Sequence, residues 1–361
     1  MMYKSTRGYS AEYSFSDAVL TGIAPDGGLF VPIKFPRFDS LEFAELCGMD
    51  YCSLAIEIFA RFVTDFTRAE LERCVRNAYA SGSFPQDPAP VVSLSSSLNV
   101  LELWHGPTSA FKDMALQILP EFLSVAIKKN EQHRKVAILT ATSGDTGKAA
   151  LAGFQDAENV KLLVFYPENG VIAVRGNFDD AQTGVKNIFT DGAFAETLKT
   201  RGYTLSSANS INIGRLLPQI VYYFYAYLSL VRKGRISAGS KINFVVPTGN
   251  FGNILACYYA EKMGLPVNRI ICATNDNNVV SDFMATGVYN SKRPFIQTIS
   301  PAMDILVSSN LERLLYEASG NDAQSVAADQ EDLKASGVYS VDKKTINNIN
   351  QSFWSSYASQ E

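Results

Sequence analysis

Two glycine-rich turns in the sequence are suited to binding anions. TSGDTG (Thr142–Gly147) and PTGNFGN (Pro247–Asn253) each follow a short apolar run and precede a helical pattern. Glycines allow backbone N–H groups to converge, and the start of a helix adds positive potential. Neither turn matches a Walker A loop or a G-x-G-x-x-G dinucleotide fingerprint. The turns indicate anion sites, although a turn that only packs a helix on a strand explains either one equally well.

A lysine stands at or just before the next candidate helix, in the segment LWHGPTSAFKDMALQIL. Lys112 opposes the helix dipole in that position. For an arbitrary lysine, a salt bridge to Asp113 or a solvated side chain is the better interpretation. Here Phe111 and the tight GPTS turn flank the lysine and indicate an enclosed position. A desolvated lysine has a favoured neutral amine, which is the usual nucleophile toward a carbonyl.

A third candidate anion site lies in SSANSINIGR, before a tyrosine-rich helical pattern. Asn209, Asn212 and Arg215 recur every three residues, and Ser210 is a candidate N-cap. Together these side chains suit a phosphate or carboxylate, with a bidentate fork from the arginine. The alternative is a capping motif with a solvent-facing arginine. The following apolar run, 216–231, is too short for a membrane span and predicts a core helix rather than a partner surface.

Strand and helix patterns alternate through most of the chain after about residue 90. Apolar runs that predict strands are Val136–Leu139, Val160–Tyr166, Ile242–Val246 and Arg269–Ala273. Strand–turn–helix units of this kind predict an α/β fold with parallel sheets, whose ligands bind at the carboxyl ends of strands. Residues 1–90 predict a separate layer, because the segment SGSFPQDPAPV is rich in Pro, Ser and Gly.

Composition narrows the function classes. The 361 residues include 32 Lys and Arg against 36 Asp and Glu, for a net charge of −4, which argues against general nucleic-acid binding. Two histidines and five cysteines without a C-x-x-C spacing give no metal site. The cysteines predict reduced thiols and the N-terminus has no apolar signal region, so we expect a cytoplasmic protein that binds neither membrane nor nucleic acid.

The segments together resemble the threonine synthase family, a group of fold type II pyridoxal-phosphate enzymes. HGPTSAFKD, TSGDTG, NSINIGR and PTGNFGN occur in that family's order and approximate spacing, and STRG and APDGGLFVP resemble its first domain. The resemblance implies two parallel-sheet lobes of the tryptophan synthase β-like kind, preceded by a small N-terminal domain. It implies that domain at 1–90, a catalytic domain at 91–361, and a smaller lobe at about 112–205.

The same resemblance implies roles for individual residues. Lys112, next to Phe111, would form the imine with pyridoxal 5′-phosphate (PLP). The cofactor phosphate would be held by Gly249, Asn250, Phe251, Gly252 and Asn253. The substrate's α-carboxylate would be received by Thr142, Ser143, Gly144, Asp145 and Thr146. The substrate phosphate would contact Asn209, Ser210, Asn212 and Arg215.

The implied reaction converts O-phospho-L-homoserine and water to L-threonine and phosphate, the last step of threonine biosynthesis, in a monomer or homodimer. Lys112 would serve as the mobile base. Two departures stand against the family pattern: 166–182 looks shortened, and the sequence ends at Glu361 where the family continues. We expect the sequence to be part of a longer chain, whose remainder supplies the partner of the pyridine nitrogen. Alternatives are another fold type II lyase, such as a threonine or serine dehydratase, and a non-catalytic phospholigand-binding relative.

Overall fold

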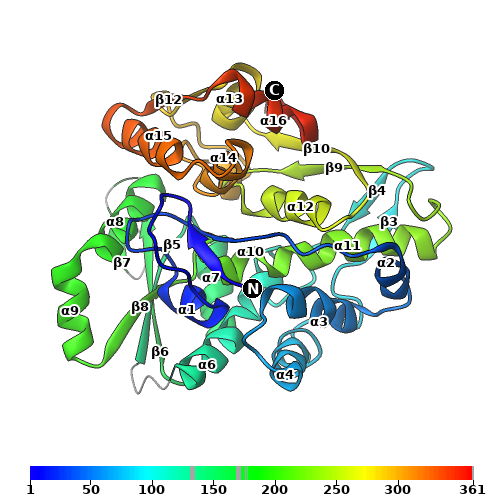
Figure 1. Ribbon diagram of the computed structural model, residues 1–361, viewed down its shortest axis with the longest axis horizontal. Coiled ribbons are helices and arrows are strands. Elements are labelled where there is room, and N and C mark those ends of the chain that lie inside the picture. The colour runs from blue at the N-terminus through cyan, green and yellow to red at the C-terminus, as the bar shows by residue number, and fades with distance from the viewer. Residues whose placement is uncertain (131–134, 168–171, 175, 177, 360–361) are drawn as a thin grey trace.

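The smaller lobe is built on a four-stranded parallel sheet (Figure 1). The structure, a computed structural model, describes residues 1–130, 135–167, 172–174, 176 and 178–359. Neighbouring strands follow the order β7-β6-β5-β8, and all three pairs are parallel. The strands are β5 (Lys135–Ala141), β6 (Val160–Pro167), β7 (Ile172–Val174) and β8 (Tyr203–Ser207). The helices of this lobe are α6 (Leu119–Lys129), α7 (Asp145–Gly153), α8 (Phe178–Thr190) and α9 (Gly192–Thr200).

The larger lobe carries a second parallel sheet, in the order β13-β10-β9. Its strands are β9 (Ile242–Pro247), β10 (Val267–Thr274) and β13 (Phe353–Tyr357). Its helices are α12 (Gly252–Lys262), α13 (Val279–Thr286), the 3₁₀ turn η1 (Pro301–Met303), α14 (Leu311–Ala318), α15 (Ala323–Ser336) and α16 (Lys343–Ser352). Two further strand pairs are antiparallel: the hairpin of β3 (Val91–Ser93) with β4 (Asn99–Leu101), and β11 (Val288–Asn290) with the distant β12 (Val338–Ser340). Two parallel-sheet lobes confirm the predicted α/β class.

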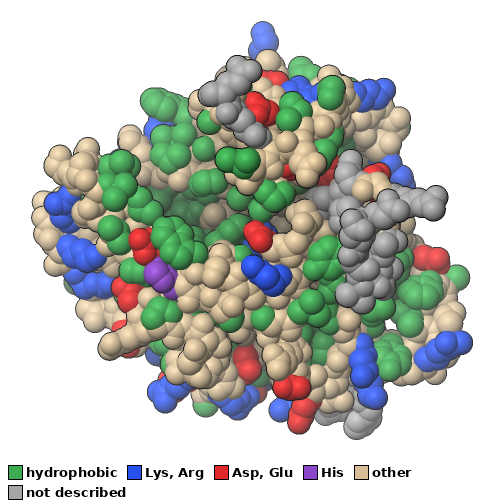
Figure 2. Space-filling model, turned by 180° about the vertical axis from the view of Figure 1, so that it is seen from behind, with side chains coloured by type: hydrophobic (Ala, Val, Ile, Leu, Met, Phe, Trp, Pro, Cys, Tyr) green, Lys and Arg blue, Asp and Glu red, His purple; other side chains and the backbone are tan. Residues whose placement is uncertain are grey.

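Part of the larger sheet is uncovered. Ile271 of β10 pairs with Val245 on one side and Trp354 on the other. Val245 is 64% exposed and Trp354 is 57% exposed. Parallel sheets are usually covered on both faces, so an exposed apolar row across three strands is unusual. Hydrophobic side chains also surround a hollow on the face seen from behind (Figure 2).

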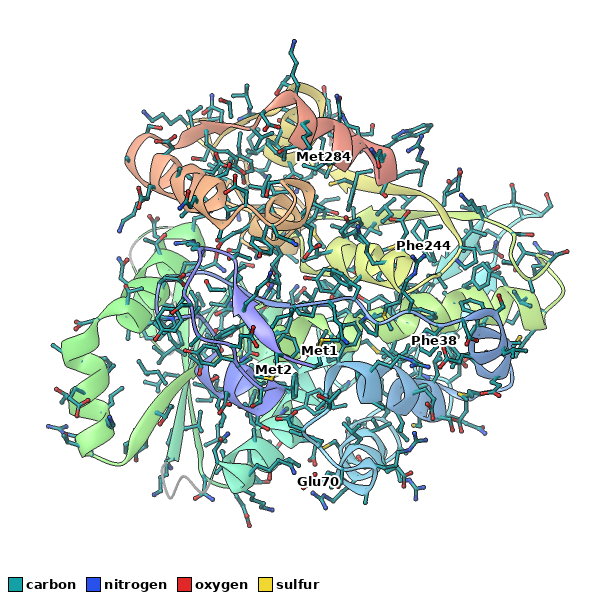
Figure 3. All side chains as sticks on the ribbon, in the orientation of Figure 1. Met1, Met2, Phe38, Glu70, Phe244 and Met284 are labelled. Carbon is teal, nitrogen blue, oxygen red and sulfur yellow. The ribbon has the colours of Figure 1, made fainter. Side chains whose placement is uncertain are left out.

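The N-terminal segment packs directly on the rest of the protein. It comprises β1 (Tyr3–Ser5), α1 (Phe15–Thr21), β2 (Phe30–Pro32), α2 (Ser40–Leu46), α3 (Tyr51–Phe62) and α4 (Arg68–Tyr79). The ring centroids of Phe15 and Phe122 are 5.2 Å apart, and those of Phe38 and Phe224 are 5.5 Å apart. Figure 3 labels Phe38. One buried hydrophobic cluster therefore runs through both parts, and the domain division at residue 90 stays a prediction.

The tyrosine-rich helix lies in the centre of the molecule. This helix is α11 (Pro218–Arg232), which directly follows the short helix α10 (Ile213–Leu216). Another short helix, α5 (Asp113–Leu116), lies much earlier in the chain. Every residue of α11 up to Leu230 is buried, which confirms the predicted core helix. No helix in the described part of the chain has the length and hydrophobicity needed to cross a bilayer. The shortened stretch at 166–182 lies partly outside the described residues.

Candidate active site

A cavity between the two lobes brings together most of the residues singled out in the sequence. Its lining includes Lys112 and Arg215, one residue of the first glycine turn and all of the second glycine turn. The predicted site residues that line it are Phe111, Lys112, Thr146, Asn209, Ser210, Arg215, Gly249, Asn250, Phe251, Gly252 and Asn253. The predicted site residues outside this lining are Thr142, Ser143, Gly144, Asp145 and Asn212. Four motifs far apart in the sequence thus converge on one cavity.

The turn PTGNFGN offers backbone donors to this cavity. β9 ends at Pro247 and α12 begins at Gly252, with Phe251 between them in the left-handed conformation at a φ of 64°. Among the described residues, no backbone oxygen accepts a hydrogen bond from the N–H groups of Gly249, Asn250 or Phe251. The first N–H groups of a helix also lack intrahelical acceptors and add positive potential. The turn is therefore equipped to bind an anion.

Two hydrogen bonds from the segment before α14 fix the carbonyl groups of the same turn. Ser308 Oγ donates to the carbonyl of Gly249 at 2.7 Å, and the backbone N–H of Asn310 donates to the carbonyl of Asn250 at 3.1 Å. A Cβ on Gly249 would come within 3.0 Å of the carbonyl oxygen of Ala302. A glycine is therefore favoured here, because any side chain would crowd a neighbouring backbone.

Lys112 stands immediately before α5 and is held in an enclosed position. Its neighbour Asp113 is fully buried and accepts hydrogen bonds from the backbone N–H and the hydroxyl of Thr108, at 2.8 and 2.7 Å. A Cβ on Gly106 would lie 2.5 Å from the Cβ of Asp113. The GPTS turn is thus closed by Asp113, and the alternative in which this carboxylate pairs with Lys112 is wrong.

The Lys112 ammonium group reaches the first glycine turn instead. Its Nζ lies 3.4 Å from Asp145 Oδ2 and 4.7 Å from the centre of the Phe111 ring. Burial lowers the pKa of Lys112 to about 8, and the nearby positive charge of Arg215 acts in the same direction, whereas Asp145 opposes the shift. A buried lysine with this pKa has an accessible neutral amine near neutral pH.

The turn TSGDTG differs from the prediction in one respect: the hydroxyl of its own Thr142 accepts hydrogen bonds from two of the backbone N–H groups that were expected to bind an anion. Thr142 Oγ1 accepts from the backbone N–H groups of Gly144 at 2.9 Å and Gly147 at 2.8 Å. Thr146 lines the cavity, and Ser143 Oγ contacts the carbonyl of Pro301 in the other lobe at 3.5 Å. Thr142 therefore shapes the turn, while Thr146 faces the site.

Asn212 and Ser210 have exchanged the roles that the sequence suggested. Asn212 is the N-cap of α10, and its Oδ1 accepts from Gly214 N. Its Nδ2 donates to the carbonyls of Val19 and Ser207, both at 2.9 Å. Because these bonds use the amide and the residue is absent from the cavity lining, the expected phosphate contact of Asn212 is wrong. Ser210 is not the cap of this helix, and it lines the cavity.

Arg215 is a buried cation on the cavity wall, which excludes the solvent-facing alternative. It is 3% exposed, and burial lowers its pKa to about 10. One guanidinium nitrogen donates to the carbonyl of Ala208. Within the described part of the chain, Nε has no acceptor and no carboxylate forms an ion pair with the group. Buried charges are normally paired, so an unpaired arginine in a cavity points to an anionic ligand.

Asn209 and Gln219 support this wall. The amide of Asn209 exchanges hydrogen bonds with the backbone N–H and C=O of Ala141, at 2.9 and 2.7 Å, and so ties the wall to the end of β5. Gln219 Nε2 donates to the carbonyl of Arg215 at 2.8 Å. Sequence reasoning missed Gln219, although its helical spacing of four residues from Arg215 was a usable signal.

Two tyrosines of α11 fix a further donor at the cavity. Tyr222 and Tyr223 both donate to Asn253 Oδ1, at 2.5 and 2.7 Å. With its oxygen so occupied, Asn253 has its Nδ2 donor available toward the cavity that it lines. In the described residues, no group of three or more His, Cys, Asp or Glu side chains is arranged to hold a metal ion.

Comparisons with known proteins agree with the arrangement of these motifs. The family model described as threonine synthase N terminus matches residues 2–79. Human threonine synthase-like 1 is 41% identical over 96% of this chain and 50% of its own length. Threonine synthase from Pseudomonas aeruginosa is 41% identical over 95% of this chain and 74% of its own length. The chain thus spans about half the length of the first of these relatives.

A solved structure supports the same relationship. The crystal structure of PLP-bound threonine synthase from Brucella melitensis superimposes with a TM-score of 0.88 at 38% identity. The match covers 99% of this chain and 78% of that protein. Because sequence identity and fold agree over nearly the whole chain, this protein belongs to the threonine synthase family.

Proposed function

We propose that this protein converts O-phospho-L-homoserine and water to L-threonine and inorganic phosphate, with PLP as cofactor. The observation that carries the proposal is that Lys112, whose side chain is 11% exposed, and the buried Arg215 line one cavity together with the start of α12. A phosphorylated amino acid acting with a phosphorylated cofactor needs two separate phosphate sites and one reactive amine. The cavity offers a candidate for each.

The residues present fit PLP. The turn between β9 and α12 carries backbone donors suited to the phosphate ester, and Asn253 adds a side-chain donor. Asn250 Oδ1 is buried without a partner among the described residues, which leaves a polar atom for a ligand to satisfy. Lys112 would hold the cofactor's aldehyde. When bound, PLP supplies an electron sink for the carbanion chemistry of an amino acid.

Lys112 is the proton carrier in this proposal. A pKa of about 8 makes both its protonated and its neutral form accessible near neutral pH. We infer that the amine removes the proton from Cα of the substrate and then acts at Cβ, where water adds. Asp145, at 3.4 Å, stabilises the protonated form between the two transfers.

Arg215 would bind the phosphate that leaves from Cγ. Its guanidinium group is buried and has no carboxylate partner in the described part of the chain, so a phosphate would neutralise it and gain charge-assisted hydrogen bonds. Ser210 and Asn209 lie on the same wall. This second anion site favours a phosphorylated substrate over the serine or threonine that a dehydratase uses.

The direct test is release of inorganic phosphate from O-phospho-L-homoserine by the PLP-loaded protein, compared with deamination of L-serine and L-threonine. We expect phosphate release with stoichiometric formation of threonine. Deamination alone would identify a different PLP lyase. Binding of PLP with no turnover of any phosphorylated amino acid would instead indicate a phospholigand-binding protein.

A further inference from the structure

A single buried asparagine joins the two candidate phosphate sites. Asn310 lies at the N-terminus of α14 and has no exposed surface. Its Nδ2 donates to the carbonyl of Asn250 at 3.0 Å and to Ser210 Oγ at 2.9 Å. Asn250 belongs to the turn before α12, and Ser210 belongs to the wall that carries Arg215. One amide nitrogen therefore bridges the two sites.

The orientation of this amide follows from its neighbours. The Asn250 carbonyl can only accept a hydrogen bond, so the atom facing it must be the nitrogen. Arg313 donates to the other amide atom, which must therefore be the oxygen. Because Ser210 Oγ accepts from Asn310, its own hydroxyl proton is directed elsewhere, and Ser210 lines the cavity. Asn310 thereby makes Ser210 a donor toward a ligand.

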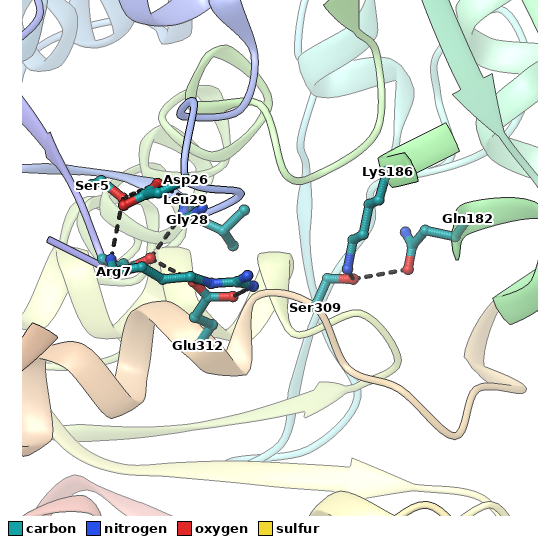
Figure 4. A network of polar contacts seen from close by, with 10 residues as sticks. Ser5, Arg7, Asp26, Gly28, Leu29, Gln182, Lys186, Ser309 and Glu312 are labelled. Carbon is teal, nitrogen blue, oxygen red and sulfur yellow. Dashed lines mark hydrogen bonds and ion pairs between the residues drawn. The ribbon is translucent and has the colours of Figure 1, made fainter. Parts of the chain in front are cut away.

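Asn310 is itself held in a rigid surrounding. Arg313 is fully buried and donates to the carbonyls of Phe30 and Ile211, at 2.9 and 2.6 Å. The adjacent Glu312 forms an ion pair with Arg7 at 2.8 Å (Figure 4). The first turn of α14 is thus fixed against the N-terminal segment and against the segment before α10. A donor on so fixed a helix can set the spacing of the loops that it contacts.

We propose that Asn310 is a positioning residue that couples the cofactor-phosphate site at 249–253 to the substrate-phosphate site at Ser210 and Arg215. The proposal rests on the proposed function, because it assigns those two sites to cofactor and substrate. Asn310 touches neither ligand. It sets the distance between the two sites, so that loss of its amide weakens both together, whereas loss of a ligand-contacting side chain weakens one.

The test compares three variants: Asn310→Ala, Arg215→Ala and Ser309→Ala. Ser309 is the matched control, because it is also buried and lies next to Asn310. Its hydroxyl bonds Gln182 and Lys186 at 2.8 and 3.3 Å and contacts neither phosphate site (Figure 4). Two quantities are measured: the Kd of PLP for the apo-protein, from the absorbance of the bound cofactor, and the KM for O-phospho-L-homoserine at saturating PLP.

We expect Asn310→Ala to raise both constants by about 10-fold, because each site loses one hydrogen bond to a buried donor, and this change corresponds to about 1.4 kcal/mol for each constant. Arg215→Ala should raise the KM by about 100-fold with an unchanged Kd for PLP. Ser309→Ala should change neither, although it lowers the melting temperature. If Asn310→Ala moves only one constant, or moves neither, the coupling role is wrong.

Two further measurements keep the proposal testable if Asn310→Ala does not fold or if the wild-type protein shows no turnover. Should Asn310→Ala not fold, Asn310→Asp retains the acceptor for Arg313 but loses both donated bonds, and it should raise the same two constants. Should the wild-type protein turn over no phosphohomoserine, the proposed function fails by itself. Binding of inorganic phosphate to the PLP-loaded protein, followed by ³¹P NMR, then replaces the KM. Equal phosphate affinity in Asn310→Ala and wild type would overturn the coupling role.

Discussion

The two glycine turns have similar sequences but use their backbone donors differently. In TSGDTG, the Thr142 hydroxyl accepts from the N–H groups of Gly144 and Gly147. In PTGNFGN, the corresponding Thr248 turns away from its turn and donates to the carbonyl of Val246 at 2.8 Å. The first turn thus occupies two of its own N–H groups, whereas in the second turn no described backbone oxygen accepts from the N–H groups of Gly249, Asn250 or Phe251. Two turns of similar glycine content therefore differ in how many donors remain for a ligand, and the orientation of the threonine side chain makes this difference.

Both turns have a positive φ at the residue directly before the helix, but this residue is a glycine in one turn and a phenylalanine in the other. Gly144 has a φ of 147° directly before α7, whereas Phe251 has a φ of 64° directly before α12. A left-handed phenylalanine is costly and persists only where the surroundings enforce it. Phe251 is 1% exposed, and its ring packs at a tilt against that of Phe353, with the centroids 5.8 Å apart. Packing of the larger lobe thus holds the second turn in its ligand-accepting shape.

The largest expected effect comes from Lys112, which lies between the two turns. Lys112→Ala removes the amine that would hold the cofactor's aldehyde, so we expect loss of the visible absorption of bound PLP and of all turnover. The fold should persist, because Asp113 and Thr108 close the local turn without this side chain. Absorbance spectra and phosphate release measure the two losses, and circular dichroism provides the control. Turnover that survives the substitution would refute the assigned role.

The next largest effect should come from a bulky side chain at Gly249, which would distort the turn PTGNFGN. In Gly249→Val the new Cβ would lie 3.0 Å from the Ala302 carbonyl oxygen and 3.2 Å from Met303 Cα, so the turn must shift and its N–H groups lose their alignment. We expect the Kd of PLP to rise about 100-fold, which corresponds to about 2.7 kcal/mol. Gly184→Val is the control, because a Cβ there meets nothing within 4 Å. An unchanged Kd in Gly249→Val would contradict the assignment of this turn.

A smaller effect should follow from removing the Thr142 hydroxyl, which accepts hydrogen bonds from two N–H groups of the turn TSGDTG. Thr142→Val keeps the side-chain shape but leaves the buried N–H group of Gly147 and the part-buried N–H group of Gly144 without their acceptor, at a cost of about 1–3 kcal/mol in unfolding free energy. Denaturant unfolding measures the loss. Inorganic phosphate should stabilise Thr142→Val by more than it stabilises the wild type or Thr248→Val, because only Thr142→Val frees further N–H groups and the Thr248 hydroxyl bonds none in its turn. Equal stability of Thr142→Val and wild type would show that the two turns do not differ in this way.

Local patterns were sufficient to predict both glycine turns and four strands of the two parallel sheets, whereas β7, β8 and β13 were not predicted. The apolar run Ile242–Val246 corresponds to β9, and Arg269–Ala273 falls within β10. These predictions succeed because strand, turn and helix start follow each other directly in the chain. The enclosed Lys112 was also signalled locally, by its aromatic neighbour and its tight turn.

Contacts between distant residues were not predictable from the sequence. Asn212 donates to the carbonyl of Val19, and nothing near either residue indicates the other. Asn310 reaches Ser210 in the same way, across 100 residues of sequence. The regular spacing of Asn209, Asn212 and Arg215 was therefore read as one ligand-binding face, although tertiary contacts occupy the central member. Periodicity places side chains on an element but does not reveal which backbone groups the fold brings to them.

The smallest effect is the pH dependence of the apo-protein. Burial lowers the pKa of Lys112 from 10.5 to about 8 in the folded state, so between these values the unfolded chain binds more protons at this group. The free energy of unfolding should therefore rise with pH by about 1 kcal/mol per unit across this window, and the contribution should be constant below it. Denaturant unfolding from pH 7.5 to 10 measures the slope, with Lys112→Met as reference. An identical slope in both proteins would mean that Lys112 is solvated, and the enclosed amine that separates the two turns would not exist.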